Sequence, residues 1–194
     1  MILCENFVCG ELNENCYVVF DTISLDAVII DPGLDNDFEK IYKYILEKNL
    51  KLRMVLLTHG HFDHIGACKK FQDEGIPIAI NKFDEPKCLS NKLSLMEEFG
   101  NGLVLNTFKP DYLFNFDEEE ISLGTLKIKA IHTPGHSEGS SSFIIGDYIF
   151  SGDTIFENGY GRTDFYDGSS QKLRHSIRKL LPYLNSGYIL KAGH

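Results

Sequence analysis

Residues 58–64, with the sequence THGHFDH, constrain the fold of this chain more than any other segment. They contain three of its seven histidines together with one aspartate. The apolar run before them, RMVLL at 53–57, is typical of a buried strand. After them Ile65, Cys68 and Phe71 recur at helical spacing. The sequence therefore predicts that the histidines lie on a loop between a strand and a helix.

The side chains of this loop have the chemistry of metal ligands. In an extended loop His59, His61 and Asp63 point to one side, because successive side chains alternate, and His64 then opens the helix. Neutral imidazole and carboxylate groups suit zinc, and also iron or manganese. A structural alternative is that Asp63 caps the helix. Three histidines together would each need a separate buried partner without a metal, so the loop predicts a metal site.

The same stretch resembles the HxHxDH signature of the metallo-β-lactamase superfamily. Other segments extend this resemblance over residues 15–194, in the expected order and at predicted strand ends. One more segment, GRTD at 161–164, is similar to a compact, glyoxalase-II-like branch. The segments that match the whole family are NCYVV at 15–19, AVIIDPG at 27–33, HTPGH at 132–136, SGDT at 151–154 and GH at 193–194.

The resemblance implies two neighbouring divalent metal ions as cofactors, expected to be zinc, with iron or manganese as alternatives. In the family the ligands come from separate loops. The sets implied here are His59, His61 and His136 for one ion, and Asp63, His64 and His194 for the other, with Asp153 bridging them. The alternative for the bridging aspartate is an ordinary turn residue. Family members continue beyond the last histidine, so the second ion is expected to bind more weakly.

Three further residues are assigned supporting roles. The resemblance implies that Asp31 orients the metal loop through hydrogen bonds. His132 is expected to pack within a strand or to donate a hydrogen bond, and not to bind metal. Arg162 would either bind a substrate carboxylate or form a salt bridge that fixes its own loop.

The hydrophobic pattern indicates an α/β chain. With 194 residues it is long enough for one domain with a sizeable core, so residues 1–194 are expected to form a single domain. A helix over 36–49, with Asn36 and Glu39 as a capping box, is expected between strands. Residues 82–118 have the weakest pattern, with partial helix at 84–99. By resemblance, the fold is a four-layer αββα sandwich.

Composition narrows the choice of partner and compartment. The net charge of −9 disfavours binding to nucleic acid, which depends on lysine and arginine neutralising phosphates. No apolar run approaches the ~18 residues needed to span a membrane, and the N-terminus lacks the features of a signal peptide. The five cysteines contain no CxxC pair, which favours a reduced, cytoplasmic setting. A small-molecule substrate is expected, and the pattern leaves the oligomeric state open.

The implied chemistry is hydrolysis. Two metal ions that share a water lower its pKa, so the resemblance implies attack on a carbonyl by a metal-bound hydroxide, with Asp63 as the catalytic residue that orients or deprotonates the water. No second acid is evident for the leaving group. A thiolate needs least help, since the pKa of a thiol is ~8.5. This favours a thioester as substrate, and the resemblance to the glyoxalase-II-like branch implies a hydroxyacyl-glutathione-like one.

Several alternatives stay open. Lactonase, phosphodiesterase and sulfur dioxygenase activities occur on the same fold. A non-catalytic, metal-stabilised binding module is the alternative from a different class. Full-length glyoxalase II enzymes carry an additional helical region that binds glutathione and has no match in these residues, so the thiol is also open.

Overall fold

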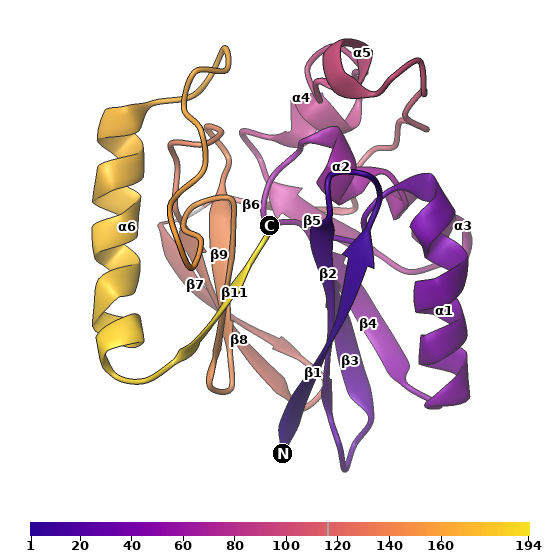
Figure 1. The fold of residues 1–194 in the computed structure, drawn as a ribbon. Coiled ribbons are helices and arrows are strands. Elements are labelled where there is room, and N and C mark those ends of the chain that lie inside the picture. Colours follow the sequence, from indigo (N-terminus) through magenta and orange to yellow (C-terminus); the bar gives the residue numbers. More distant parts are fainter. Residues whose placement is uncertain (116) are drawn as a thin grey trace.

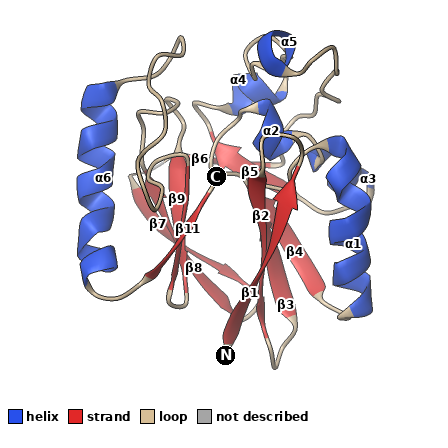
Figure 2. Cartoon of the chain, viewed as in Figure 1, coloured by secondary structure: helices blue, strands red, loops and turns tan. Residues whose placement is uncertain are grey.

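Two β-sheets packed face to face form the centre of the protein, and helices cover their outer faces (Figures 1 and 2). The computed structural model describes residues 1–115 and 117–194. The first sheet contains, in spatial order, β1 (Ile2–Cys9), β2 (Glu14–Asp21), β3 (Asp26–Ile30), β4 (Lys51–Leu56), β5 (Ile78–Asn81) and β6 (Tyr112–Phe114). The second contains β11 (Ile189–Ala192), β10 (Tyr148–Gly152), β9 (Ser141–Ile145), β8 (Leu126–His132) and β7 (Glu118–Leu123).

The helices complete four layers. Helices α1 (Phe38–Glu47) and α3 (Cys68–Asp73) lie on the outer face of the first sheet, and α6 (Ser170–Asn185) lies on the outer face of the second (Figure 1). The predicted αββα sandwich is therefore confirmed. No helix in the described part of the chain is long and apolar enough to cross a membrane.

Parallel pairing in the first sheet places three chain segments at one edge. Strands β3, β4, β5 and β6 pair in parallel, whereas β1 and β2 are antiparallel to their neighbours. Parallel strands end on the same side of a sheet, so the segments that follow them emerge together. Asp31 follows β3, residues 57–61 follow β4, and residues 82–84 follow β5.

The second sheet presents a matching edge. Strand β9 is antiparallel to both β8 and β10, and β10 is parallel to β11, so β8, β10 and β11 run in one direction. The segments after these three strands are residues 133–136, Asp153 and residues 193–194. A hydrogen bond from Asn15 N to Gly193 O, at 2.8 Å, joins the two edges. The segments that carry the sequence motifs thus meet between the sheets.

Strand β3 shows how period-two alternation builds the core. Ala27 and Ile29 pack beneath the helices of the first sheet, whereas Val28 and Ile30 pack against the second sheet. All four are at most 1% exposed. Complete burial of an aliphatic side chain of this size stabilises a fold by roughly 1.5–3 kcal/mol. The continuous apolar run therefore reflects a strand that is covered on both faces.

The helix predicted over 36–49 and the partial helix predicted at 84–99 are present, and the main difference lies at the start of the first. The helix expected over 36–49 begins as a 3₁₀ turn, η1 (Asp35–Asp37), and continues as α1. Asn36 and Glu39 do not occupy the capping positions, and the prediction of a capping box between them is wrong; the Asp37 carboxylate instead accepts a hydrogen bond from Leu34 N at 2.9 Å. The segment 82–118, of which residue 116 lies outside the described residues, forms short elements: α4 (Glu85–Cys88), α5 (Met96–Phe99) and β6.

A candidate metal centre between the two sheets

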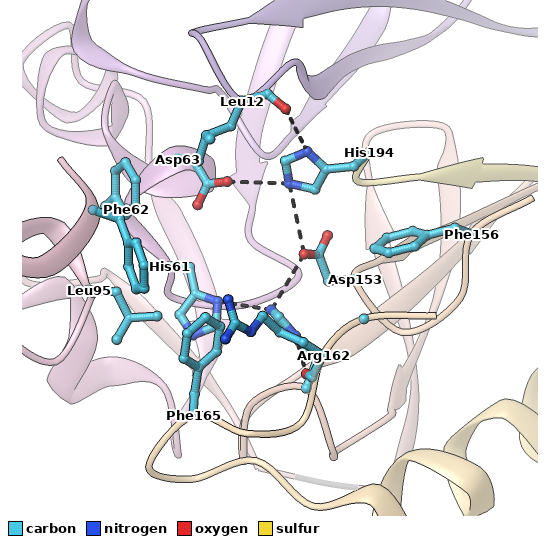
Figure 3. Close-up of a pocket in the computed structure, with 13 residues that line it drawn as sticks. Leu12, His61, Phe62, Asp63, Leu95, Asp153, Phe156, Arg162, Phe165 and His194 are labelled. Atoms are coloured by element: carbon cyan, nitrogen blue, oxygen red, sulfur yellow. Dashed lines mark hydrogen bonds and ion pairs between the residues drawn. The ribbon is translucent and has the colours of Figure 1, made fainter. Parts of the chain in front are cut away.

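Six histidine and aspartate side chains from both sheets, with a seventh at the C-terminal segment, converge at the shared edge. Figure 3 labels His61, Asp63, Asp153 and His194 among them. The first sheet supplies its part through the loop after β4 and the short helix α2 (Phe62–Ile65). The second sheet supplies the remainder through the segments after β8, β10 and β11. These side chains are His59, His61, Asp63, His64, His136, Asp153 and His194, the full set expected from the sequence.

Three buried histidines form the first group. Atoms of His59, His61 and His136 that can bind a metal all lie within 4.8 Å of one another. Burial, together with neighbouring imidazoles, lowers the pKa of His59 and of His61 well below the ordinary value. Both imidazoles are therefore neutral at pH 7, which is the form that binds a metal ion.

Asp63, His64 and His194 form the second group, again with candidate ligand atoms within 4.8 Å. Asp63 Oδ2 lies 3.3 Å from His194 Nε2. Burial acts to raise the pKa of Asp63, but the two histidines hold it below its usual range. Burial disfavours the His64 cation, yet the carboxylates of Asp63 and Asp153 outweigh this and raise the pKa of His64 to about 10. The carboxylates around this group therefore favour positive charge within it, which suits the binding of a cation.

Asp153 lies between the two groups. Its Oδ2 is 3.4 Å from His136 Nε2 in the first group and 3.8 Å from His194 Nε2 in the second. Its Oδ1 is 3.6 Å from His64 Nε2. The close approach requires glycine at position 193, because a Cβ there would lie 2.3 Å from Asp153 Oδ1. The position is that of a carboxylate able to bridge two ions.

Unpartnered polar atoms test whether a metal suits this arrangement. Nε2 of His59, His61 and His64 and Oδ1 of Asp153 are buried and have no hydrogen-bond partner in the described structure. An unsatisfied buried polar group costs ~1–3 kcal/mol, so such groups rarely gather without a reason. Metal coordination would satisfy all of them. The donor set of imidazole and carboxylate fits zinc, iron or manganese.

Asp31 holds the metal loop through hydrogen bonds, and the side chain of Asp63 faces the cavity. The Asp31 carboxylate accepts hydrogen bonds from Thr58 N at 2.8 Å and Thr58 Oγ1 at 2.6 Å, and lies 3.0 Å from His64 Nδ1. With a proton on Nδ1, the Nε2 of His64 is free to bind metal. Asp63 makes no helix-capping hydrogen bond, because α2 begins after His61 and Asp63 lies inside it. The helix-cap interpretation of Asp63 is therefore wrong.

Two further predicted residues lie at the margin. His132 lies outside the cluster, where its Nε2 is 2.8 Å from Glu138 O and its ring stacks on Phe83. The Arg162 side chain forms two hydrogen bonds with Asp164, at 2.6 and 2.7 Å, so the salt-bridge interpretation of this residue is the one the geometry shows. The backbone O of Arg162 is 2.8 Å from His136 Nδ1 and orients that imidazole.

A buried carboxylate next to the histidines, that of Asp84, was not evident from the sequence. Asp84 accepts hydrogen bonds from Gly60 N and Gly139 N, each at 2.8 Å, and from Ser137 Oγ at 2.7 Å. Gly60 separates His59 from His61, and Ser137 follows His136, so Asp84 fastens both parts of the three-histidine group. Its position after β5, parallel to the strand before the metal loop, is the signal that could have identified it.

Asp84 is itself held by Lys87. The Lys87 Nζ lies 2.6 Å from Asp84 Oδ1 and 2.7 Å from Asp167 Oδ2. Burial opposes the charge, but the two carboxylates raise the pKa of Lys87 above its usual range. Asp167 also accepts a hydrogen bond from Glu138 N at 3.0 Å. The network therefore extends from the metal loop to the segment that carries Phe165.

A cavity of about 430 Å³ opens onto both groups (Figure 3). Asp63 and Asp153 line it together with His61, His136 and His194. The rest of its described lining is mainly apolar. Its volume is within the range of ~300–1,000 Å³ found for small-molecule sites.

Several known proteins are similar to this chain in sequence and in fold. The family model described as metallo-beta-lactamase superfamily matches residues 9–186. Hydroxyacylglutathione hydrolase GloC from Haemophilus influenzae is 36% identical over 185 residues, which cover 93% of this chain and 85% of that protein. The crystal structure of BLEG-1 B3 metallo-beta-lactamase has a TM-score of 0.91 and 32% identity, and covers 99% of this chain and 91% of that chain. TTHA1623 in a di-iron-bound form has a TM-score of 0.80 and 28% identity, with 98% and 91% covered.

Proposed function

The chain belongs to the metallo-β-lactamase superfamily, and from this premise we propose that it is a metal-dependent hydrolase that cleaves a thioester of a small molecule. The observation that carries the proposal is the pair of ligand groups that share Asp153 and open into one cavity. The similarity to hydroxyacylglutathione hydrolase GloC supports the thioester as the bond that is cleaved.

The seven side chains listed above would hold two divalent ions. His59, His61 and His136 would hold one ion, and Asp63, His64 and His194 the other, with Asp153 between them. When bound, such ions lower the pKa of a shared water towards neutrality and polarise the carbonyl of the substrate. Zinc is the expected metal. The similarity to a di-iron-bound protein keeps iron as an alternative.

Asp63 is the proposed catalytic residue. Its carboxylate lines the cavity and is ionised at neutral pH, since His64 and His194 hold its pKa below the usual range. An ionised carboxylate accepts a hydrogen bond from the attacking water and orients the water oxygen towards the acyl carbon. A carbon–oxygen bond then forms as the carbon–sulfur bond breaks, which yields a carboxylic acid and a thiol.

The leaving group decides between a thioester and an amide. The described lining of the cavity contains no lysine, tyrosine, cysteine or glutamate that could protonate a departing nitrogen. A thiolate leaves without prior protonation, because the pKa of a thiol is only ~8.5. This favours cleavage of a thioester over that of an amide or a β-lactam.

Metal analysis combined with a substrate panel tests the proposal. Purified protein is expected to contain at least one zinc, iron or manganese ion per chain and to hydrolyse a simple thioester faster than a lactone, a phosphodiester or a β-lactam. His136→Ala should abolish turnover, whereas His175→Ala, on the exposed face of α6, should not. Faster turnover of a lactone or phosphodiester would replace the thioester, and metal without turnover of any substrate would indicate a binding module.

A further inference from the structure

The cavity beside the ligand groups has an apolar wall built from four different parts of the chain. Leu12 comes from the turn between β1 and β2, and Phe62 from α2 (Figure 3). Phe99 is the last residue of α5, and Leu95 directly precedes that helix. Phe156 and Phe165 come from the segment after β10. Leu12 is 51% exposed and Phe99 is 40% exposed. Large apolar side chains that remain exposed at the mouth of a cavity point to a ligand that covers them.

The cavity offers little positive charge to a ligand. Arg162 is the one lysine or arginine in its described lining. Its Nε and Nη2 donate to Asp164, at 2.6 and 2.7 Å, and the guanidinium lies over the Phe165 ring, 4.4 Å from its centre. Because this bidentate carboxylate already neutralises the charge of Arg162, a carboxylate of the substrate would gain less from binding there. Metal ions would supply positive charge only at the reacting group.

The apolar wall continues outwards. A second hollow of about 340 Å³ shares Leu12, Phe62 and Phe99 with the first and extends past Leu103. Its described lining includes the carboxylates of Glu11 and Asp37 and no lysine or arginine. Asp37 is already paired with Lys40, whose Nζ lies 2.6 Å from its Oδ1, and an anionic group in this position would face the carboxylate of Glu11. An uncharged apolar group would instead remove Leu12, Phe99 and Leu103 from water, which is favourable.

We propose that the substrate is a thioester whose group beyond the reacting carbonyl is an uncharged alkyl or aryl chain, seated along Leu12, Phe62 and Phe99. This rests on the proposed thioesterase activity. It makes a carboxylate-bearing thiol such as glutathione a poor partner, because Arg162, already paired with Asp164, is the one lysine or arginine in the described lining of the two hollows. Arg162 acts as part of the wall rather than as a carboxylate receptor.

A crossed set of four thioesters tests the proposal. Each of two acyl groups, lactoyl and hexanoyl, is joined to glutathione and to uncharged N-acetylcysteamine. For either acyl group we expect kcat/KM to be at least 10-fold higher for the N-acetylcysteamine thioester. Along a series of straight acyl chains kcat/KM should rise by up to about 4-fold per methylene, the selectivity of complete burial. Equal or higher kcat/KM for the glutathione thioesters would overturn the proposal.

Two variants locate the effect. Phe99→Ser should raise KM for the hexanoyl thioester and leave the lactoyl thioester nearly unchanged. Phe83→Ser is the matched control, because Phe83 is similarly exposed, at 46%, and lies outside both hollows. Asp164→Asn frees Arg162 and should raise the ratio of glutathione to N-acetylcysteamine turnover. The same ratio in wild type and Asp164→Asn would show that the Arg162–Asp164 pair does not exclude carboxylates.

Binding separates this proposal from the proposed activity. Calorimetry with non-hydrolysable thioethers, S-hexyl-N-acetylcysteamine and S-hexylglutathione, measures the preference without turnover. Tighter binding of the uncharged thioether, combined with no hydrolysis of any thioester, would refute the activity and leave the apolar ligand class standing. Tighter binding of S-hexylglutathione would refute the ligand class whatever the activity.

Discussion

Lys87 Nζ lies 2.6 Å from Asp84 Oδ1, and each residue is at most 1% exposed. The pair sits directly beneath the candidate metal centre. Gly60, which separates two of its histidines, donates its backbone N–H to the same carboxylate. Through this hydrogen bond the charged pair holds the backbone of the metal loop in place. Its energetic importance follows from burial, since removal of one partner leaves the other charge uncompensated.

Lys87→Met is therefore expected to lower the free energy of unfolding by about 3–5 kcal/mol, the cost of breaking a buried ion pair. It should also weaken metal binding at the three-histidine group by about 10–100-fold, as loss of a ligand-orienting contact does. Urea unfolding of the metal-free protein and the visible spectrum of cobalt(II) in the first site are the measurements. Arg53→Met is the control, because Arg53 forms an ion pair with the buried Asp26, which lies outside the metal centre. Asp26 also accepts a hydrogen bond from Thr125 N. An unchanged cobalt spectrum in Lys87→Met would show that the pair does not position the ligands.

The sequence could reveal the metal loop because three histidines between an apolar strand and a helix have few structural explanations. It could not reveal Asp84 in the same way. An aspartate with a lysine three residues later is usually an exposed ion pair, and only the tertiary fold buries this one. Because β5 pairs with β4, the turn after β5 lies next to the metal loop. Asp84 in that turn accepts hydrogen bonds from two loops, at Gly60 and Gly139.

Fold class was predictable for a related reason. The apolar run at 53–57 identified β4, and the resemblance carried by the motifs implied the sandwich. Helix starts were not predictable from propensity alone, since Asn36 and Glu39 suit a capping box but Asp37 forms the local contact instead.

His59→Ala should reduce activity by several orders of magnitude more than His132→Ala. His59 is 1% exposed and belongs to the first group of ligands. The side chain of His132 instead contacts Glu138 O and the ring of Phe83, outside the cluster. Loss of a metal ligand removes the ion, while loss of a supporting contact costs about 10–100-fold. Steady-state kinetics at the same total metal concentration, with the metal content of each variant measured, gives the comparison. Equal losses in the two variants would disprove the assignment of His59 as a ligand.

Asp63→Asn should preserve the fold and lower turnover by about 10²–10⁴-fold, the usual contribution of an acid–base group. Asparagine is nearly isosteric, and no helix cap is lost because Asp63 makes none. It carries no negative charge and cannot accept a proton as a carboxylate does. Circular dichroism should match wild type while thioester hydrolysis is lost. Near wild-type turnover would remove Asp63 from the mechanism.

Metal binding should occur in two steps of different affinity. His59, His61 and His136 are at most 4% exposed, whereas the His194 side chain is 25% exposed. An exposed ligand must be ordered on binding, which costs conformational entropy. Stepwise calorimetric titration should therefore show a tighter first event, and His194→Ala should abolish the weaker event alone. Loss of the tighter event in His194→Ala would reverse the assignment.

Acid should weaken the link between the sheets at Asp26. The hydrogen bond from Thr125 N and the Arg53 side chain lower the pKa of Asp26 to about 2, from an ordinary value of 3.8. A depressed pKa stabilises the fold above pH 3.8, and this contribution is lost as the pH falls through 2. Asp26→Asn should thus be less stable than wild type at pH 7, and the difference should narrow between pH 4 and 2. Urea unfolding of the metal-free proteins measures it, and a deficit independent of pH would contradict the ionic origin.

Because the histidines and aspartates come from both sheets, a metal ion bound by them would also hold the two halves of the sandwich together. His59, His61 and His64 belong to one half of the sandwich, while His136 and Asp153 belong to the other. An ion that binds both halves binds the docked state and not the separated one. At a free concentration 1,000 times its dissociation constant, such an ion adds ~4.1 kcal/mol to stability. The availability of metal would then set how long the molecule persists, independently of how fast it turns over substrate.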